Sequence, residues 1–486
     1  MQGLSISRIF LFSLVLSVIM ACDTSNIPTG GTGTTQKTWS AVETPFAIND
    51  MSITQIKMGA DASGNHSIVL YQYAQRWRAD SYNNGSWVGV SDYTFNSNSC
   101  KHTYYGSNDT ISTSHYYING NSDSIGVCAT STASGDELNI VQYSLASGWG
   151  APENAVAADA ANPGNRSTAA VAENKVGDIM MVWIERPSGA GASQLKSRRK
   201  TNGIWGNVVT IGDSNSYGNN DSTGLDLHLE MDQNERGDVI AAYHRYYGTF
   251  SYNGLTYACF SVHGMYYDHL TGWSTIHKLD DRVCNVFEDI YRKPINVKIA
   301  DNGNATIVWY DGDKASIDVN HYFYNTGWGS VQTLSFSPNT PNPTLAGDKN
   351  GNFAVTWTEA AQVNVPSSVQ TVWVDYFDAS LGWQSPQQLS DDTGDSSNAR
   401  IGFDDQGNAL FVWAQMNTST NSPEIRYRWI NKTTGPDAQG TIEAFSPDLL
   451  NQTSPMMEIS TTDSGDAMVF VATSYTNGKA LVSMYK

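Results

Sequence analysis

The sequence predicts an all-β chain in which one small sheet recurs about every 50 to 65 residues. One anchor is a polar turn with a glycine, an apolar run, and an aromatic residue six positions after the glycine. It occurs as Gly177 with Trp183, Gly237 with Tyr243, Gly303 with Trp309, Gly351 with Trp357, and Gly407 with Trp413. A second anchor is a Gly-Trp pair later in the repeat, at Gly148, Gly272, Gly327 and Gly382. Because both anchors recur at the same positions within successive units, they favour a repeated sheet over a plain two-sheet sandwich.

Each unit predicts four strands, as the unit around Gly303 illustrates. Residues 295–299 alternate apolar and polar side chains, which indicates a half-buried strand. A turn at 301–304 leads into residues 305–309, a run that suits a strand buried on both faces. Residues 319–324 predict a third strand, and Gly327 with Trp328 opens the last one.

Counting the units gives eight, and the pattern resembles a β-propeller over residues 37–486. The second unit is degenerate, with residues 121–124 in place of the glycine turn, so seven blades is the alternative. The eighth unit stops at Lys486 after three strands. Residues 38–42 resemble the missing strand, so we expect the N- and C-terminal strands to pair and close the ring.

The first 22 residues predict a targeting segment rather than folded structure. Arg8 precedes an apolar stretch, and residues 19–22 resemble the lipobox of bacterial lipoproteins, which implies that Cys22 is lipidated. Residues 23–36 are rich in Thr, Gly and Ser and predict a flexible tether. We therefore expect a lipid-anchored protein of the bacterial envelope, periplasmic or at the cell surface, with its propeller domain at 37–486.

The acidic charge balance of the chain argues against two classes of partner, nucleic acids and anionic membrane surfaces. The chain carries 28 basic and 47 acidic residues, a formal net charge of −19. A nucleic-acid partner needs a basic face, which this composition argues against, and a polybasic membrane anchor is equally disfavoured. We expect the lipid to be the only contact with the membrane.

Four cysteines remain if Cys22 is lipidated, and in an exported chain they predict disulfides. The economical pairs are Cys100 with Cys128 and Cys259 with Cys284. A zinc alternative combines four possible ligands: Cys259, His263, His277 and Cys284. The Asp- and Asn-rich turns leave Ca²⁺ as a further alternative, although we expect no cofactor.

A ligand site is expected on the face opposite the glycine turns, where loops leave the second strands. The repeat becomes polar two residues after its aromatic anchor, and the charged members predicted to bind a ligand are Glu185, Arg245, Asp311 and Glu359. The fourth unit carries a long aromatic segment at 243–252, expected as a loop. Its candidate catalytic residues are Tyr243, His244, Arg245 and Tyr246, with residues up to Tyr247 in the same cluster.

The turn at Asp301, Asn302 and Gly303 resembles the turns of sialidase propellers, but Trp309 comes six residues after the glycine instead of three. No sialidase site residue is carried over. The sequence predicts a binding or scaffold module for a glycan or an envelope protein. The alternative is an enzyme acting on polysaccharide, a lyase or glycosidase, with its site in the fourth unit.

Overall fold

The computed structural model describes most of the repeat region. The described residues are 37–44, 53–72, 76–83, 85–89, 91–94, 115–118, 121, 123–144, 146–159, 165–186, 194–213, 229–252, 255–286, 295–311, 314–336, 343–360, 369–442, 445, 455–472 and 480–486. Thr38–Lys486 forms one compact unit. The predicted signal segment, Cys22 and the tether lie outside the described residues. No helix in the described part is long and apolar enough to cross a membrane.

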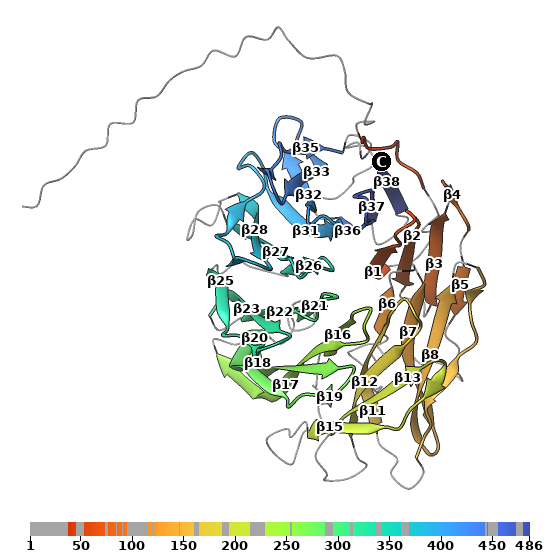
Figure 1. Ribbon diagram of the computed structural model, residues 1–486. Helices are drawn as coiled ribbons and strands as arrows, with labels where there is room; N and C mark the ends of the chain where they lie inside the picture. Colours follow the sequence, from red (N-terminus) through yellow and green to blue (C-terminus); the bar gives the residue numbers. More distant parts are fainter. Residues whose placement is uncertain are drawn as a thin grey trace, which may run out of the picture. The chain divides into compact units, whose positions relative to one another are not determined.

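The strands of this unit form eight separate antiparallel sheets arranged in a ring (Figure 1). The first sheet contains β1 (Ile53–Ala60), β2 (His66–Gln72), β3 (Arg76–Asn83), β4 (Ser86–Trp87) and β5 (Ser91–Thr94), and the second contains β6 (His115–Ile118), β7 (Ser124–Thr132), β8 (Gly135–Ser144), β9 (Gly148–Trp149) and β10 (Glu153–Val156). The third sheet contains β11 (Asn165–Glu173), β12 (Ile179–Arg186), β13 (Gln194–Thr201), β14 (Ile204–Trp205) and β15 (Val209–Asp213). The fourth contains β16 (Leu229–Gln233), β17 (Val239–Tyr252), β18 (Leu255–Asp268), β19 (Gly272–Trp273) and β20 (His277–Val286).

The fifth sheet contains β21 (Asn296–Ile299), β22 (Ala305–Asp311), β23 (Ser316–Phe323), β24 (Gly327–Trp328) and β25 (Gln332–Phe336), and the sixth contains β26 (Thr344–Gly347), β27 (Phe353–Ala360), β28 (Gln370–Asp378), β29 (Gly382–Trp383) and β30 (Gln387–Gln388). The seventh sheet contains β31 (Ser396–Phe403), β32 (Ala409–Asn417), β33 (Ser422–Asn431), β34 (Gly435–Pro436) and β35 (Gly440–Thr441). The eighth contains β36 (Met456–Thr461), β37 (Ala467–Ala472) and β38 (Ala480–Tyr485). The chain is an eight-bladed β-propeller, and its blades are numbered 1 to 8 in the order in which the eight sheets are given above. The prediction of eight blades is confirmed, and the seven-blade alternative is wrong because β6 to β10 form a sheet of their own.

Each pair of neighbouring blades shares one apolar core, and together these cores run around the ring. In blade 5 the second strand, β22, is buried along its whole length, as the sequence predicted for a strand between two sheets. Its anchor Trp309 is fully buried in the core shared with blade 4. The ring also packs where the last blade meets the first, because Ile68 of β2 and Phe470 of β37 belong to one core.

The Gly-Trp anchor ties a blade to the segment before it. The indole N–H of Trp149 donates to the Ser91 carbonyl at 3.1 Å, and that of Trp205 donates to Glu153 Oε1 at 2.7 Å. The Trp273 indole donates to Ser197 Oγ at 2.8 Å. These bonds satisfy a part-buried donor and link adjacent blades in three places, whereas Trp328 Nε1 has no hydrogen-bond partner among the described residues.

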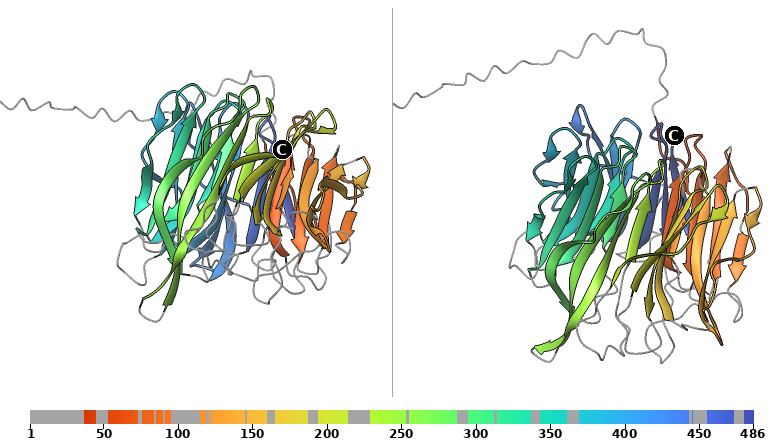
Figure 2. Two further views of the ribbon diagram at one scale, coloured as in Figure 1. Left: turned by 90° about the horizontal axis from the view of Figure 1, so that it is seen from below. Right: turned by 60° about the horizontal axis from the view of Figure 1, so that its bottom comes forward.

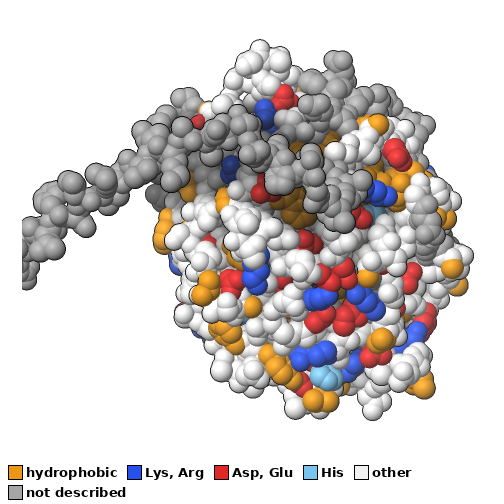
Figure 3. Space-filling view, turned by 45° about the horizontal axis from the view of Figure 1, so that its top comes forward, with side chains coloured by type: hydrophobic (Ala, Val, Ile, Leu, Met, Phe, Trp, Pro, Cys, Tyr) orange, Lys and Arg blue, Asp and Glu red, His pale blue; other side chains and the backbone are white. Residues whose placement is uncertain are grey.

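The glycine turns join the first and second strands of the blades and lie on one face, here called the hairpin face. Gly303 shows why glycine is required, since its φ is 88° and an added Cβ would lie 2.2 Å from Arg236 Nη2. Hydrogen bonds link successive turns from blade 2 to blade 8: Asn121 to Lys175, Lys175 to Glu235, Glu235 to Asp301, Asp301 to Lys349, Asn350 to Asp405 and Asp405 to Asp463. Acidic and basic side chains gather side by side near the middle of this face (Figure 3).

The N-terminal segment of the unit lies beside β38. Trp39 forms an isolated bridge with Tyr485 and Glu43 forms one with Val482, supported by backbone hydrogen bonds of 2.7–2.9 Å such as Ser40 N to the Met484 carbonyl. The predicted closing strand is represented by these bridges alone, and its pairing as a full strand stays a prediction.

Candidate functional site

The polar residues predicted at the ends of the second strands have partners inside their own blades. Trp183 Nε1 lies 3.5 Å from Glu185 Oε2, and Trp357 Nε1 donates to Glu359 Oε2 at 3.0 Å. In blade 7 the Trp413 indole donates to Gln415 Oε1 at 3.1 Å. Residues two apart on a strand share a face, so in these three blades the polar residue lies where it can accept the indole N–H. Blade 5 departs from the pattern, because Trp309 Nε1 has no hydrogen-bond partner among the described residues although Asp311 follows it by two positions.

Glu185 is the most fully paired of the four predicted binding residues. It is 5% exposed, accepts a hydrogen bond from Arg166 Nε at 2.9 Å and forms an ion pair with Lys196. Burial acts to raise its pKa, but the bonds from Lys196 and Arg166 outweigh burial and hold the pKa below its ordinary value. Its negative charge is already neutralised within blade 3.

Asp311 is also neutralised by a lysine. Its side chain is fully buried, and Lys314 Nζ lies 2.8 Å from its Oδ2. The same ammonium lies 3.0 Å from Asp280 and 3.5 Å from Asp318. Burial keeps the pKa of Asp311 above its ordinary value despite Lys314. The three carboxylates lie close enough together to hold a metal ion, but a lysine of the chain provides the positive charge among them.

The other predicted residues come from separate blades. Arg245 lies on β17 and is half-buried, while Glu359 lies on β27 and also accepts a hydrogen bond from Ser335 Oγ at 2.5 Å. The four residues thus belong to blades 3, 4, 5 and 6. The loops that would complete this face, including those after β12 and β27, lie largely outside the described residues.

The fourth blade corrects one expectation. Residues 243–252 were expected as a loop, but they continue β17, which pairs with β18 as far as Tyr252 opposite Leu255. The extended hairpin projects past its neighbours (Figure 2). The signal that was missed is Asn253 and Gly254 between two runs rich in aromatic and β-branched residues, a pair typical of tight β-hairpins.

This correction bears on the candidate catalytic residues. Tyr243 is 1% exposed and stacks on His263 with ring centroids 5.2 Å apart. His244 is 2% exposed and packs against Phe260. Both rings belong to the packing of the blade, and the side chain of Tyr246 lies outside the description. No accessible acid–base pair is formed by the described part of this cluster.

Cys259 of β18 lies directly opposite Cys284 of β20 in the strand register. That position suits the predicted disulfide, which stays a prediction, as does the pair formed by Cys128 with Cys100, a residue outside the description. The zinc alternative requires both histidines beside these cysteines. Instead, His263 hydrogen-bonds Ser261 Oγ at 2.8 Å, and His277 stacks on Trp328 of blade 5.

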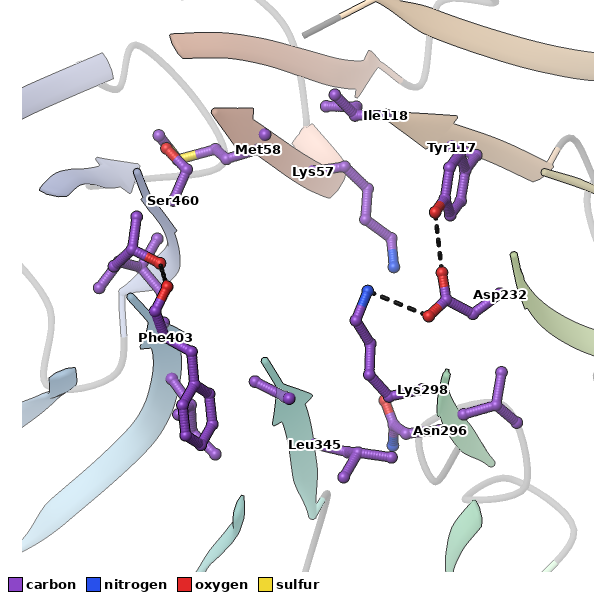
Figure 4. A pocket seen from close by; sticks show the side chains of 18 of the residues that line it. Lys57, Met58, Tyr117, Ile118, Asp232, Asn296, Lys298, Leu345, Phe403 and Ser460 are labelled. Atoms are coloured by element: carbon purple, nitrogen blue, oxygen red, sulfur yellow. Dashed lines mark hydrogen bonds and ion pairs between the residues drawn. The ribbon is translucent and has the colours of Figure 1, made fainter. Parts of the chain in front are cut away.

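An axial cavity of about 370 Å³ lies where the innermost strands converge. Seven blades contribute to its wall, through β1, β6, β16, β21, β26, β31 and β36. Small and apolar residues such as Ala346 and Gly402 line one part, while charged and hydrogen-bonding side chains of β1, β6, β16 and β21 line another. Figure 4 shows the charged part, where side chains from four blades point toward one another. The cavity is therefore chemically asymmetric.

Two lysines point into the charged part of this cavity (Figure 4). Lys298 Nζ lies 3.0 Å from Asp232 Oδ2, and Tyr117 donates to Asp232 Oδ1 at 2.8 Å. Burial, with the nearby Asp232 carboxylate, raises the pKa of Tyr117 well above its usual value, so the phenol remains a neutral donor. Lys57 is exposed to the cavity and has no ion pair or hydrogen bond with any described side chain. Asp232 thus has partners, whereas the Lys57 ammonium has none among the described residues.

This group of residues was not predicted from the sequence, although its signal is present there. The alternation at 295–299 predicted a half-buried strand, and its polar positions, Asn296 and Lys298, are the residues that line the axis. Lys57 follows the same rule in β1. The polar positions of the first strands, more than the ends of the second strands, mark the inside of the ring.

Comparisons with known proteins add little about chemistry. No protein-family model matches the chain, and no curated protein matches it. Solved structures resemble it at low identity. An ulvan lyase bound to its saccharide matches with 9% identity and a TM-score of 0.41, covering 89% of this chain and 94% of its own. A Penicillium chrysogenum α-L-arabinanase complexed with arabinobiose has 10% identity and a TM-score of 0.34, over 65% of this chain and 92% of its own.

A third similar structure is the intramolecular trans-sialidase from Ruminococcus gnavus, with 10% identity and a TM-score of 0.33, covering 80% of this chain and 97% of its own. These likenesses are too remote to bring an activity or a substrate to this chain. The cavity itself must carry the functional argument.

Proposed function

We propose that this protein is a binding module of the bacterial envelope that holds an acidic group of a glycan in its axial cavity. The observation that supports the proposal is Lys57, whose ammonium faces the cavity without a partner among the described residues. In a chain with a net charge of −19, a cation is readily paired on the surface. A lysine at the axis that lies near Lys298 and has no partner in the described part of the chain favours an anionic ligand.

The rest of the cavity suits a sugar that bears a carboxylate. A volume of about 370 Å³ lies within the usual range for small-molecule sites. Lys298 is held at 3.0 Å by Asp232, so its ammonium keeps a fixed place in the same part of the cavity as Lys57. The small and apolar wall at Ala346 and Gly402 offers a surface for the carbon face of the ring.

The envelope location is part of the same proposal and has its support in the sequence. The apolar N-terminal segment and the lipobox-like residues ending at Cys22 imply a lipid anchor, and the tether would separate the propeller from the membrane. Membrane fractionation of Cys22→Ser tests this part. The variant is expected to leave the membrane fraction, and its retention there would contradict the anchor.

The ligand is tested by titration calorimetry of the mature chain with galacturonate and glucuronate oligomers, beside the corresponding neutral oligomers. Wild type is expected to bind an acidic oligomer with an affinity that falls as salt is added. Lys57→Ala should weaken binding about 10-fold or more, whereas Lys57→Arg should retain most of it.

Lys278→Ala is the matched control, because it removes one exposed lysine on β20 that is paired locally with Asp281. It should leave binding unchanged. Equal binding by wild type and Lys57→Ala, or no preference for acidic over neutral oligomers, would remove the proposal. The enzyme alternative receives no support from an observation in the described residues, since Tyr243 and His244 are buried.

A further inference from the structure

A second recess lies on the side of the ring, between blades 3 and 4. Its volume is about 520 Å³, and its walls come from β12, β13 and β15 on one side and from β18 and β19 on the other. We call it the lateral groove. Met180, Ile211 and Val209 supply an apolar part, and Trp273 stands on the opposite wall. The groove is separate from the axial cavity, with which it shares no lining residue.

Trp273 packs differently from Trp205 and Trp328, whereas Trp87 and Trp383 share its edge-on contact with an aromatic ring of their own blade. The ring of Trp205 is covered by Arg198 at 5.4 Å and Lys200 at 5.7 Å, and Trp328 is covered by the stacked ring of His277. Trp273 meets Tyr267 only edge-on, at 5.2 Å. No ring or cation of the described residues stacks on its face, and its N–H is held by Ser197, so the indole is fixed in the wall of the groove.

The two arginines that line the lateral groove already have ion-pair or hydrogen-bond partners within the protein. Arg199 forms an ion pair with Asp178 at 3.0 Å and donates to the Tyr267 hydroxyl at 3.3 Å. Arg198 donates to the carbonyls of Gly206 and Ala155. An anionic ligand would therefore have to displace existing bonds, which distinguishes this groove from the axial cavity.

Neutral polar groups remain available at its rim. Asn207, Thr210 and Thr275 are exposed, and their side chains have no hydrogen-bond partner in the described part of the chain. An open aromatic face with amide and hydroxyl groups around it matches the two sides of a sugar ring, an apolar C–H face and an equatorial set of hydroxyls. We propose that the lateral groove binds a neutral sugar residue.

The test uses the mature chain and three neutral disaccharides, cellobiose, mannobiose and chitobiose, observed by saturation-transfer NMR and by calorimetry. At least one is expected to bind. Trp273→Ala should weaken it about 10-fold or more, the scale expected for loss of a central aromatic contact. Because Trp273 also joins two blades, a second variant is needed. Thr210→Trp fills the groove from an exposed position and should abolish binding without unfolding the ring.

Trp383→Ala is the matched control, because it removes the same Gly-Trp anchor from blade 6 and should leave the sugar affinity unchanged. Lys57→Ala should also leave it unchanged, so failure of the axial-cavity proposal and failure of this one are distinguishable. The inference is overturned if none of the three sugars binds, if binding survives Thr210→Trp, or if Trp383→Ala reduces it as much as Trp273→Ala.

Discussion

Asp375 offers the sharpest test of how burial acts in this ring. It lies on β28 in blade 6, is 3% exposed, and its Oδ1 has no hydrogen-bond partner among the described residues. Burial raises the pKa of its carboxyl from 3.8 to about 7, although the backbone N–H groups of Tyr376 and Gln384 act in the opposite direction. Near neutral pH the folded protein is therefore strained by a carboxylate in a site that favours the acid.

The perturbation is Asp375→Asn, which keeps the shape and one accepting oxygen but cannot ionise. The folded state holds the Asp375 proton more tightly than the unfolded chain does, so protonation of Asp375 stabilises the folded state. This contribution to the free energy of unfolding is fully present below about pH 4. That stability is lost as the pH rises through about 7. A pKa difference of about three corresponds to about 4 kcal/mol. The stability of Asp375→Asn relative to wild type should therefore rise by up to about 4 kcal/mol between pH 4 and pH 8.

The assay is urea unfolding followed by tryptophan fluorescence at several pH values, with the comparison always made against wild type. Asp80→Asn is a second member of the series. It occupies the matching position of blade 1, and burial raises its pKa to about 6, so it should show a smaller rise. Asp378→Asn should do the opposite: burial opposes the shift, but bonds from Ser380 hold the pKa of Asp378 below its ordinary value. If the free energies of unfolding of Asp375→Asn and wild type differ by the same amount at every pH, burial does not raise the pKa of Asp375 and the reasoning is refuted.

Three further predictions concern packing and pairing. Gly126→Ala places a Cβ 2.2 Å from the Trp77 ring and should lower the free energy of unfolding by about 1–3 kcal/mol. Gly150→Ala, whose added Cβ has its nearest contact at 3.4 Å, should lower the free energy of unfolding by less. Urea unfolding midpoints of the two variants and wild type test this difference. Lys314→Met leaves three carboxylates without their cation and should cost about 2 kcal/mol near pH 7 and less near pH 4, where a pH-independent loss would contradict the ion-pair role. Cys259→Ser should cost about 3 kcal/mol under oxidising conditions and little under reducing ones, and equal midpoints in both would exclude the disulfide.

The repeat was predictable because its anchors have local causes. Glycine is needed where the turn requires positive φ, as at Gly303, and a tryptophan is needed where an indole N–H joins two blades, as at Trp205. Even the degenerate second unit keeps its strands, so counting succeeded. These constraints act within a few dozen residues and therefore leave a periodic trace in the sequence.

The site was less predictable because partner choice is not periodic. Glu185 and Asp311 look like exposed charges in the sequence, but Arg166 and Lys314 neutralise them in the fold. Lys57 and Lys298 lie far apart in the chain and meet only because their strands are both innermost. Which charges keep a partner depends on long-range register, which no single unit contains.

The shared cores between blades have a consequence for engineering. Since blade 8 packs on blade 1 through Ile68 and Phe470 much as interior neighbours pack on each other, no sheet is privileged as a beginning or an end. A circular permutant, with the native termini joined by a short linker and new ones opened in the connection between blades 5 and 6, should fold with the same core. Such a permutant would also let the proposed lipid anchor be placed at a different point on the rim.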